Sequence, residues 1–228
     1  MSRPEIGPEP DAVVPEAVGF VLAGGRSSRM GEDKALVRLG GQPLVVHALG
    51  ILREAGLTAA VAGALSPLAA FAPVVEDSEP GLGPLGGISA ALASTSARLA
   101  VFLPVDLPLL PASAITFLLG HAHITGRPVT VPSVNGFAQT FPAVLDRAVL
   151  SVLETELEAG RRCCFSGFQA AAARLGGPVT VLPMEMLVQS GHVAHPEGLP
   201  AARWFLNVNA AEGLRLAHEY RGHPHRVS

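Results

Sequence analysis

Short apolar runs alternate along most of the chain with longer segments of helical periodicity. Six runs are rich in aliphatic residues and bounded by turn residues, so they predict strands. They cover residues 18–23, 58–63, 73–76, 98–103, 128–132 and 178–182. The first and fourth runs are almost wholly apolar, as expected of strands that are buried on both faces of a parallel sheet. We therefore predict that these two strands lie at the centre of the sheet.

The segments between the strands predict helices. Between residues 43 and 55, apolar side chains recur at helical spacing, with Pro43 at the start and Gly56 just past the end. The same reasoning predicts helices at residues 85–96, 111–122, 147–159 and 210–220. Strands that alternate with helices are typical of the α/β class, so we predict a three-layer α/β/α sandwich with a mostly parallel central sheet.

One stretch has no clear period. Residues 184–203 contain Gly, Pro and His, and we interpret them as a mobile flap or a late insertion. The first sixteen residues hold four prolines and four acidic residues, which predicts a disordered N-terminal tail over 1–16. The remaining chain is the length of one domain, which we place at 17–221, followed by a C-terminal tail at 222–228.

The composition narrows the classes of function. Sixteen Lys and Arg stand against nineteen Asp and Glu, a net charge of −3, so there is no basic excess to hold a nucleic acid. Two long apolar stretches, 55–75 and 99–119, contain prolines, and the second also contains Asp106, so neither predicts a membrane span. The adjacent Cys163 and Cys164 are badly placed to bridge to each other, and we expect a cytoplasmic protein that binds neither nucleic acid nor membrane.

The sharpest motif follows the first strand, where residues 22–34 read Leu-Ala-Gly-Gly-Arg-Ser-Ser-Arg-Met-Gly-Glu-Asp-Lys. Gly24 and Gly25 permit a tight turn with unshielded amide donors, while Arg29 and Lys34 supply cations for phosphate groups. The string is neither a Walker loop nor a dinucleotide fingerprint, because both of those spacings are absent. From these residues alone, a phosphate loop and an ordinary strand-to-helix turn with surface charges both remain open.

The whole string resembles the signature of nucleotidyltransferases of the molybdenum cofactor guanylyltransferase family. The resemblance continues in order at residues 39–44, 76–78, 83–88, 104–108 and 207–209, and covers roughly residues 18–216. It implies the Rossmann-like fold shared with nucleotide-diphospho-sugar transferases. It also implies transfer of GMP from GTP to Mo-molybdopterin, which yields the guanine dinucleotide cofactor and pyrophosphate.

The resemblance assigns three catalytic residues. Asp106 stands just beyond the carboxyl end of a central strand, where a hard carboxylate can hold Mg²⁺, and it matches the magnesium ligand of the family. Lys34 matches the lysine that touches the nucleotide phosphates, where a compact charge can stabilise the departing pyrophosphate. Arg29 is the expected second phosphate clamp.

Further residues are assigned to the two substrates by the same resemblance. The nucleotide-binding set comprises Leu22, Ala23, Gly24, Gly25, Lys34, Asp77, Gly83 and Asp106. Asp77 could accept hydrogen bonds from ribose hydroxyls or from the guanine edge. Asn207 and Asn209 match the family's Asn-x-Asn near the acceptor or metal side of the cleft, although Asn209 with Glu212 also has the spacing of a helix capping box.

The chain departs from the family at residues 61–64, Val-Ala-Gly-Ala, where members often have an Asn that contacts the nucleotide. This departure affects base recognition rather than phosphate or metal binding. The cytidylyltransferase branch typically has Leu-Ala-Ala-Gly at the opening motif, so Gly24 favours GTP over CTP. Sugar-phosphate and isoprenoid-precursor nucleotidyltransferases, or a catalytically silent relative, remain alternatives. We expect a monomer that binds GTP and molybdopterin, with molybdoenzymes or cofactor-insertion proteins as partners.

Overall fold

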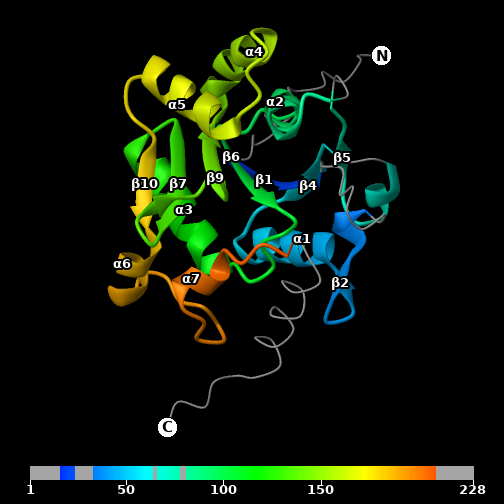
Figure 1. Cartoon of the computed structure of the whole chain (residues 1–228), viewed down its shortest axis with the longest axis vertical. Helices are drawn as coiled ribbons and strands as arrows, with labels where there is room; N and C mark the ends of the chain where they lie inside the picture. The colour runs from blue at the N-terminus through cyan, green and yellow to red at the C-terminus, as the bar shows by residue number, and fades with distance from the viewer. Residues whose placement is uncertain (1–15, 24–32, 64–65, 78–80, 209–228) are drawn as a thin grey trace, which may run out of the picture.

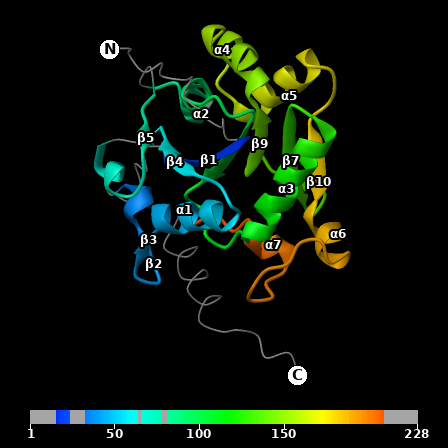
Figure 2. The same cartoon turned by 180° about the vertical axis from the view of Figure 1, so that it is seen from behind.

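The computed structural model of the chain describes residues 16–23, 33–63, 66–77 and 81–208, which build one large sheet flanked by helices (Figures 1 and 2). The sheet has eight strands in the order β10-β7-β9-β6-β1-β4-β5, with β8 paired to β7. The strands are β1 (Ala17–Leu22), β4 (Ala59–Ala62), β5 (Val74–Val75), β6 (Leu99–Pro104), β7 (Val129–Val134), β8 (Phe137–Ala138), β9 (Ala143–Asp146) and β10 (Thr180–Pro183). The predicted strands all form, within a residue or two of their expected ends.

The sheet is mostly parallel, as predicted. β1 pairs in parallel with β4 and β6, β4 with β5, and β10 with β7. The exceptions are β9, which runs antiparallel to both of its neighbours, β6 and β7, and the short strand β8, which runs antiparallel to β7. β6 is the middle strand of the seven along this order and β1 is beside it, so the prediction that these two strands are central is confirmed.

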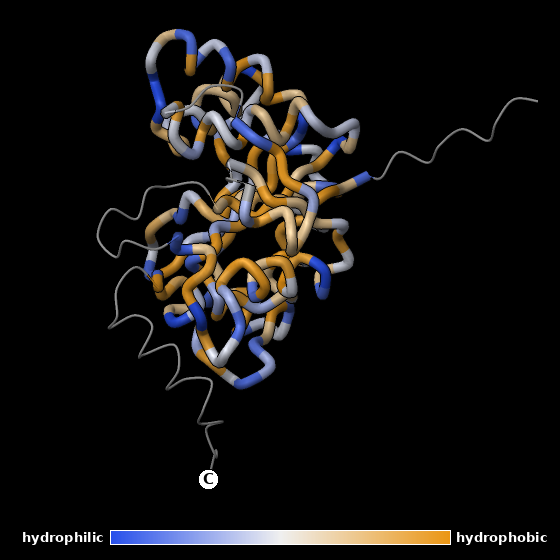
Figure 3. The backbone as a smooth tube through the Cα atoms, turned by 90° about the vertical axis from the view of Figure 1, so that its right-hand side faces the viewer, coloured by the Kyte–Doolittle hydropathy of each residue, from blue (hydrophilic) through white to orange (hydrophobic). Residues whose placement is uncertain are grey.

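Alternate residues of the central strands face two separate hydrophobic cores, because successive strand side chains point to opposite faces. Val21 and Val101 pack with α1 (Leu44–Glu54) and α3 (Ala112–Thr125) in the first core. Phe20 and Phe102 pack with α2 (Pro84–Ala93), α4 (Leu150–Glu158) and α5 (Cys164–Arg174) in the second. The three-layer sandwich is thereby confirmed, and the apolar segments gather along its middle in Figure 3.

Several short elements were not predicted. They are α5, β8, β9, the hairpin of β2 (Arg38–Leu39) with β3 (Gln42–Pro43), and the 3₁₀ turn η1 (Lys34–Leu36). The helix predicted at 147–159 begins with the 3₁₀ turn η3 (Arg147–Val149) and continues as α4, and a further turn, η2 (Ser66–Ala70), lies between β4 and β5. The predicted helix at 210–220 lies outside the described residues, as do both expected tails apart from Glu16. Within the described part of the chain, no helix is long and apolar enough to cross a bilayer.

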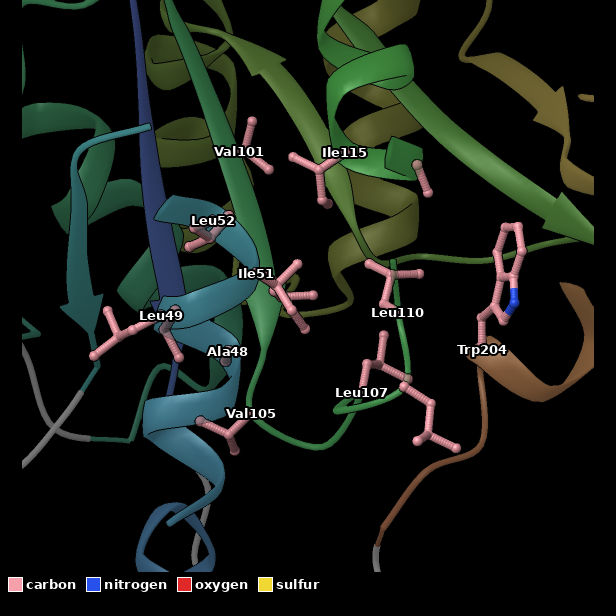
Figure 4. Packing of buried hydrophobic residues seen from close by; sticks show 14 of the residues in the cluster. Ala48, Leu49, Ile51, Leu52, Val101, Val105, Leu107, Leu110, Ile115 and Trp204 are labelled. Carbon is pink, nitrogen blue, oxygen red and sulfur yellow. The ribbon is translucent and has the colours of Figure 1, made fainter. Parts of the chain in front are cut away.

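The interpretation of residues 184–203 as a flap is wrong. This segment forms α6 (Met184–Gln189) and leads into α7 (Ala201–Trp204). Met184, Val193 and Trp204 are almost completely buried and belong to the first core. Figure 4 shows the Trp204 ring in the same cluster as Leu107 and Leu110 of the loop after β6. The sequence lacks a period here because the apolar anchors are spaced irregularly along a folded loop.

Phe102 offers a test of the second core. Its ring is fully buried and stacks on that of Phe20, with centroids 5.5 Å apart. We expect Phe102→Ala to lower the free energy of unfolding by about 3–5 kcal/mol, because it leaves a cavity between sheet and helix. Phe137→Ala is the matched control, since Phe137 is 73% exposed and its loss should change stability by less than about 0.5 kcal/mol. Equal urea midpoints for the two variants would contradict this placement of Phe102.

Candidate active site

The carboxyl ends of the parallel strands meet at one edge of the sheet. Leu22, the last residue of β1, is in register with Ala62 of β4 on one side and Pro104 of β6 on the other. Asp106 follows β6 by two residues, and Asp77 follows the end of β5 by two residues. Open α/β sheets bind ligands at this edge, because the loops there leave space beyond the strands.

Lys34 and Asp106 form an ion pair at this edge. The Lys34 Nζ donates to Asp106 Oδ2 at 2.6 Å, and the two side chains are only 22% and 17% exposed. Lys34 begins the turn η1, whose first residue is capped by Asp33, since the Asp33 carboxylate accepts from the Ala35 amide at 3.0 Å. The two residues of the Asp-Lys pair in the motif therefore have different roles. Asp33 caps the turn, and Lys34 forms the ion pair with Asp106.

Asn207 completes this cluster from the far end of the chain. With its amide nitrogen facing Asp106, Asn207 donates to Oδ2 at 2.9 Å and to Oδ1 at 3.3 Å. The next backbone amide, that of Val208, donates to the Asp106 carbonyl oxygen at 3.1 Å. The structure thus brings together Lys34, Asp106 and Asn207, three of the residues predicted from sequence, although they are far apart along the chain.

A buried tryptophan holds the segment that carries Asn207. The Trp204 indole Nε1 donates to the Leu199 carbonyl oxygen at 2.8 Å, and its ring stacks on His195 with centroids 6.2 Å apart. His195 Nε2 donates in turn to the carbonyl oxygen of Leu109 at 3.1 Å, in the loop that follows Asp106. Sequence reasoning missed both residues, because neither belongs to a motif.

Asp77, one of the predicted nucleotide residues, lies close to Gly87 of α2. The Asp77 Oδ1 atom is buried and has no hydrogen-bond partner among the described residues, and burial raises the pKa of this carboxyl above its ordinary value. A Cβ added to Gly87 would lie 3.0 Å from that oxygen and 3.4 Å from the Gly63 Cα, so any larger residue would press on one of these neighbours. An unpaired carboxylate oxygen in such a place can accept a hydrogen bond from a ligand.

Other members of the predicted nucleotide set have clear positions. Gly83 precedes α2 and has a φ of 71°, which favours glycine. Leu22 is buried, and the Ala23 amide donates to the Ala62 carbonyl oxygen at 3.2 Å, which extends the β1–β4 pairing by one residue. Four predicted site residues, Gly24, Gly25, Arg29 and Asn209, lie outside the described residues.

A cavity of about 360 Å³ opens beside Asp106. It is lined by Leu22, Pro84, Pro104, Asp106, Leu107, Gln139, Thr140, Phe141, Phe205 and Asn207. Sequence reasoning missed Gln139, Thr140, Phe141 and Phe205. The only available signal was a polar pair before Phe-Pro in the 139–142 stretch, and without the fold nothing connects that stretch to Asp106.

The oxygen donors of Asp106 and Asn207 fit a hard divalent cation. Among the described residues there is no group of three His, Cys, Asp or Glu side chains that could hold a metal by themselves. One carboxylate and one amide instead suit a cation that takes its remaining ligands from water and phosphate. In the structure the Asn207 amide nitrogen lies 2.9 Å from Asp106 Oδ2, and a half-turn of the amide would bring its oxygen to that place.

Comparison with known proteins agrees with this geometry. Residues 19–175 match the sequence model of the MobA-like NTP transferase domain. A probable molybdenum cofactor guanylyltransferase of Haloferax mediterranei is 33% identical over 209 residues, which are 86% of this chain and 90% of that protein. A molybdenum cofactor guanylyltransferase of Xanthomonas euvesicatoria is 45% identical over 102 residues, which are 44% of this chain and only 52% of the relative. Among solved structures, molybdopterin-guanine dinucleotide biosynthesis protein A of Archaeoglobus fulgidus has a TM-score of 0.70 at 21% identity, covering 90% of this chain and 98% of its own.

Asp77 gives a pH-dependent prediction. Because burial raises the pKa of Asp77, its ionised form destabilises the folded protein at neutral pH, and this destabilisation disappears as the pH falls through the folded pKa. We expect Asp77→Asn to raise Tm at pH 7.5 and to lose this advantage near pH 4, while it weakens nucleotide binding. The measurement is Tm against pH, with Glu76→Gln, an exposed neighbour, as the control. A lower Tm for Asp77→Asn at pH 7.5 would contradict the interpretation.

His195 gives a prediction on the segment that carries Asn207. We expect His195→Ala to cost about 1–2 kcal/mol, because it removes the bond to Leu109 and leaves that carbonyl oxygen without its donor. Trp204 is the only tryptophan, so a red shift of the intrinsic emission would report its exposure. His192→Ala is the control, since His192 contacts Ser190 and Phe117 instead. Identical stability and emission in the two variants would show that His195 does not hold the segment.

Proposed function

The chain belongs to the family of MobA-like NTP transferase domains, and from this premise we propose that it is a molybdenum cofactor guanylyltransferase. It transfers GMP from GTP to the terminal phosphate of Mo-molybdopterin and releases pyrophosphate. The observation that carries the proposal is the cluster of Lys34, Asp106 and Asn207 at the carboxyl edge of the sheet. A lysine and a carboxylate at a ligand-binding edge are the groups that a metal-bound triphosphate requires.

Asp106 and Asn207 would hold Mg²⁺, with the carboxylate oxygen and the amide oxygen as its protein ligands. When bound, the ion would neutralise the charge of the triphosphate oxygens during transfer. Magnesium suits this pair because it needs few protein ligands and keeps phosphate and water oxygens in its other positions.

The remaining chemistry is positioning. An oxygen of the acceptor phosphate forms a bond to the α-phosphorus of GTP while the bond from that phosphorus to the pyrophosphate oxygen breaks. The Lys34 ammonium is a compact charge that contacts the phosphates and stabilises the negative charge that develops on the leaving group. Arg29 acts as a second clamp. The reaction needs no covalent intermediate with a side chain of the protein.

Asp77 is proposed to bind the nucleoside. Its buried oxygen without a partner can accept from the ribose hydroxyls or from the N–H groups of the guanine edge. The backbone at Gly63 lies beside it, and this is the stretch where the sequence lacks the asparagine that other members often have. We propose that Asp77 and backbone groups supply the nucleoside contacts that this missing side chain does not make.

The proposal extends to the setting of the reaction. We place it in the cytoplasm, which is supported by two cysteines that are both free. The product would pass to a molybdoenzyme or to a cofactor-insertion protein. We propose a monomer with a single nucleotidyltransferase domain.

Thermal stabilisation by nucleotides tests the donor. GTP with Mg²⁺ at a hundred times its dissociation constant should stabilise the protein by about 2.7 kcal/mol, or raise Tm by roughly 2–4 °C for a chain of this length. We expect GTP to exceed CTP, ATP and UTP, and Asp106→Asn to abolish the dependence on Mg²⁺. Glu54→Gln is the matched control, because Glu54 ends α1 at the opposite edge of the sheet.

Turnover then tests the reaction. With GTP, Mg²⁺ and molybdopterin, pyrophosphate release should fall by at least about 10²-fold in Asp106→Asn and stay normal in Glu54→Gln. A preference for CTP would assign the chain to the cytidylyltransferase branch instead. Binding of GTP without turnover would favour a catalytically silent relative, and no response to any nucleotide would contradict the proposed function.

A further inference from the structure

The wall of the cavity beside Asp106 has two parts. Leu22 and Asp106, which belong to the predicted nucleotide set, line it together with Pro84 and Pro104, whereas Asp77 and Gly83 do not. The C-terminal half of the chain supplies the other part, from the stretch between β8 and β9 and from Phe205 just after α7. The volume of about 360 Å³ is within the usual range for small-molecule sites, roughly 300–1,000 Å³.

The direction of the reaction gives this cavity a role. In transfer between phosphates, the attacking oxygen and the leaving oxygen lie roughly in line on opposite sides of the phosphorus. Under the proposed function, Lys34 and the nucleotide residues hold the triphosphate, so the acceptor needs a further surface beside Asp106. The part of the cavity wall that comes from the C-terminal half of the chain supplies such a surface, next to Asp106 and Asn207.

The wall has the chemistry of a site for a flat heterocycle. Phe141 and Phe205 supply two phenyl rings, and the Phe141 ring is held edge-on by the buried Phe168, with centroids 6.1 Å apart and planes at 90°. Aromatic side chains bind planar rings by stacking or by edge contacts. Gln139, Thr140, Phe141 and Phe205, which the C-terminal half of the chain contributes to the wall, are all uncharged. They therefore suit the ring of an acceptor rather than its phosphate.

Two polar groups on the wall can read the edge of such a ring. The Gln139 backbone amide donates to the Pro132 carbonyl oxygen at 2.8 Å, and its side-chain Nε2 donates to the Phe137 carbonyl oxygen at 3.0 Å. These bonds fix the side chain and leave its Oε1 with no partner among the described residues. The Thr140 hydroxyl likewise has no partner there, and it can both donate and accept.

We propose that Gln139, Thr140, Phe141 and Phe205 bind the planar heterocycle of the acceptor and determine acceptor specificity. This inference rests on the proposed function, in which the acceptor is a phosphorylated pterin. The two phenyl rings hold the plane of the heterocycle, and Thr140 and Gln139 recognise its hydrogen-bonding edge. The acceptor phosphate then points to Asp106 and Asn207 on the wall of the same cavity.

The test separates acceptor binding from donor binding. Phe141→Leu keeps an apolar side chain but removes the flat ring, and we expect it to raise the KM for molybdopterin about five- to tenfold. Thr140→Val keeps the shape of the side chain and removes the hydroxyl, and we expect about a tenfold rise. The KM for GTP and the GTP-induced rise in Tm should stay within about twofold of wild type. Phe137→Leu, on the same hairpin but 73% exposed, is the matched control.

An unchanged KM for molybdopterin in both variants, or an equal rise in both KM values, would overturn the proposal. A direct binding measurement keeps it testable if the wild-type protein shows no turnover. Calorimetric titration with neopterin monophosphate, in the presence of Mg²⁺ and a non-hydrolysable GTP analogue, should then show binding that weakens in Phe141→Leu and Thr140→Val but not in Phe137→Leu. Turnover failure with this pattern contradicts only the proposed function, whereas absence of pterin binding to the wild type contradicts the acceptor site.

Discussion

The parallel register of β1 with β6 is the constraint on which the site depends. The two strands pair from Ala17 with Leu99 to Leu22 with Pro104, so their carboxyl ends stand at the same level. Asp106 is reached two residues after that level and meets Lys34 at 2.6 Å. A slip of one residue would exchange the two faces of a strand and turn its aromatic side chains toward the wrong core. The packing of both cores and the position of the carboxylate are therefore set by the same pairing.

The elements that the sequence predicted well are those whose signal does not depend on a partner. β1 and β6 are buried on both faces, so every residue is apolar, and α1 shows its period along a single face. β9 has four residues and is a strand because β6 and β7 lie on either side of it. Gly167 made α5 hard to predict, since glycine disfavours helices, yet a Cβ there would be 3.3 Å from Leu153. The glycine permits close approach of α5 to α4, and only the fold reveals that reason.

The residues of the candidate site also fall into two groups, those that a local sequence motif carries and those that only the fold brings to the site. Lys34, Asp106 and Asn207 could be predicted because a motif carries each of them, and the fold brings these motifs together. Trp204 and His195 belong to no motif. They hold the segment before Asn207 through two different carbonyl oxygens, that of the nearby Leu199 for Trp204 and that of Leu109 in a distant loop for His195. The polar and aromatic residues 139–141 are recognised only because they line the same cavity as Asp106. Side chains that act through three-dimensional proximity leave no periodic or local pattern in the sequence.

Under the proposed function, the ion pair of Lys34 with Asp106 favours binding of the nucleotide together with its metal ion. Lys34 and Asp106 form an ion pair while both are mostly buried, so a ligand that binds only one of them breaks this ion pair without replacing it. A free phosphate and a free cation each meet this cost, whereas a triphosphate that brings its cation satisfies both side chains at once. Asn207 can adapt when the cation replaces Lys34 at Asp106. A half-turn of its amide removes the N–H donor from the carboxylate and puts the amide oxygen in its place, where it can bind the cation. The site is thereby matched to the metal–nucleotide complex rather than to either component, which is the species that carries a transferable nucleotidyl group.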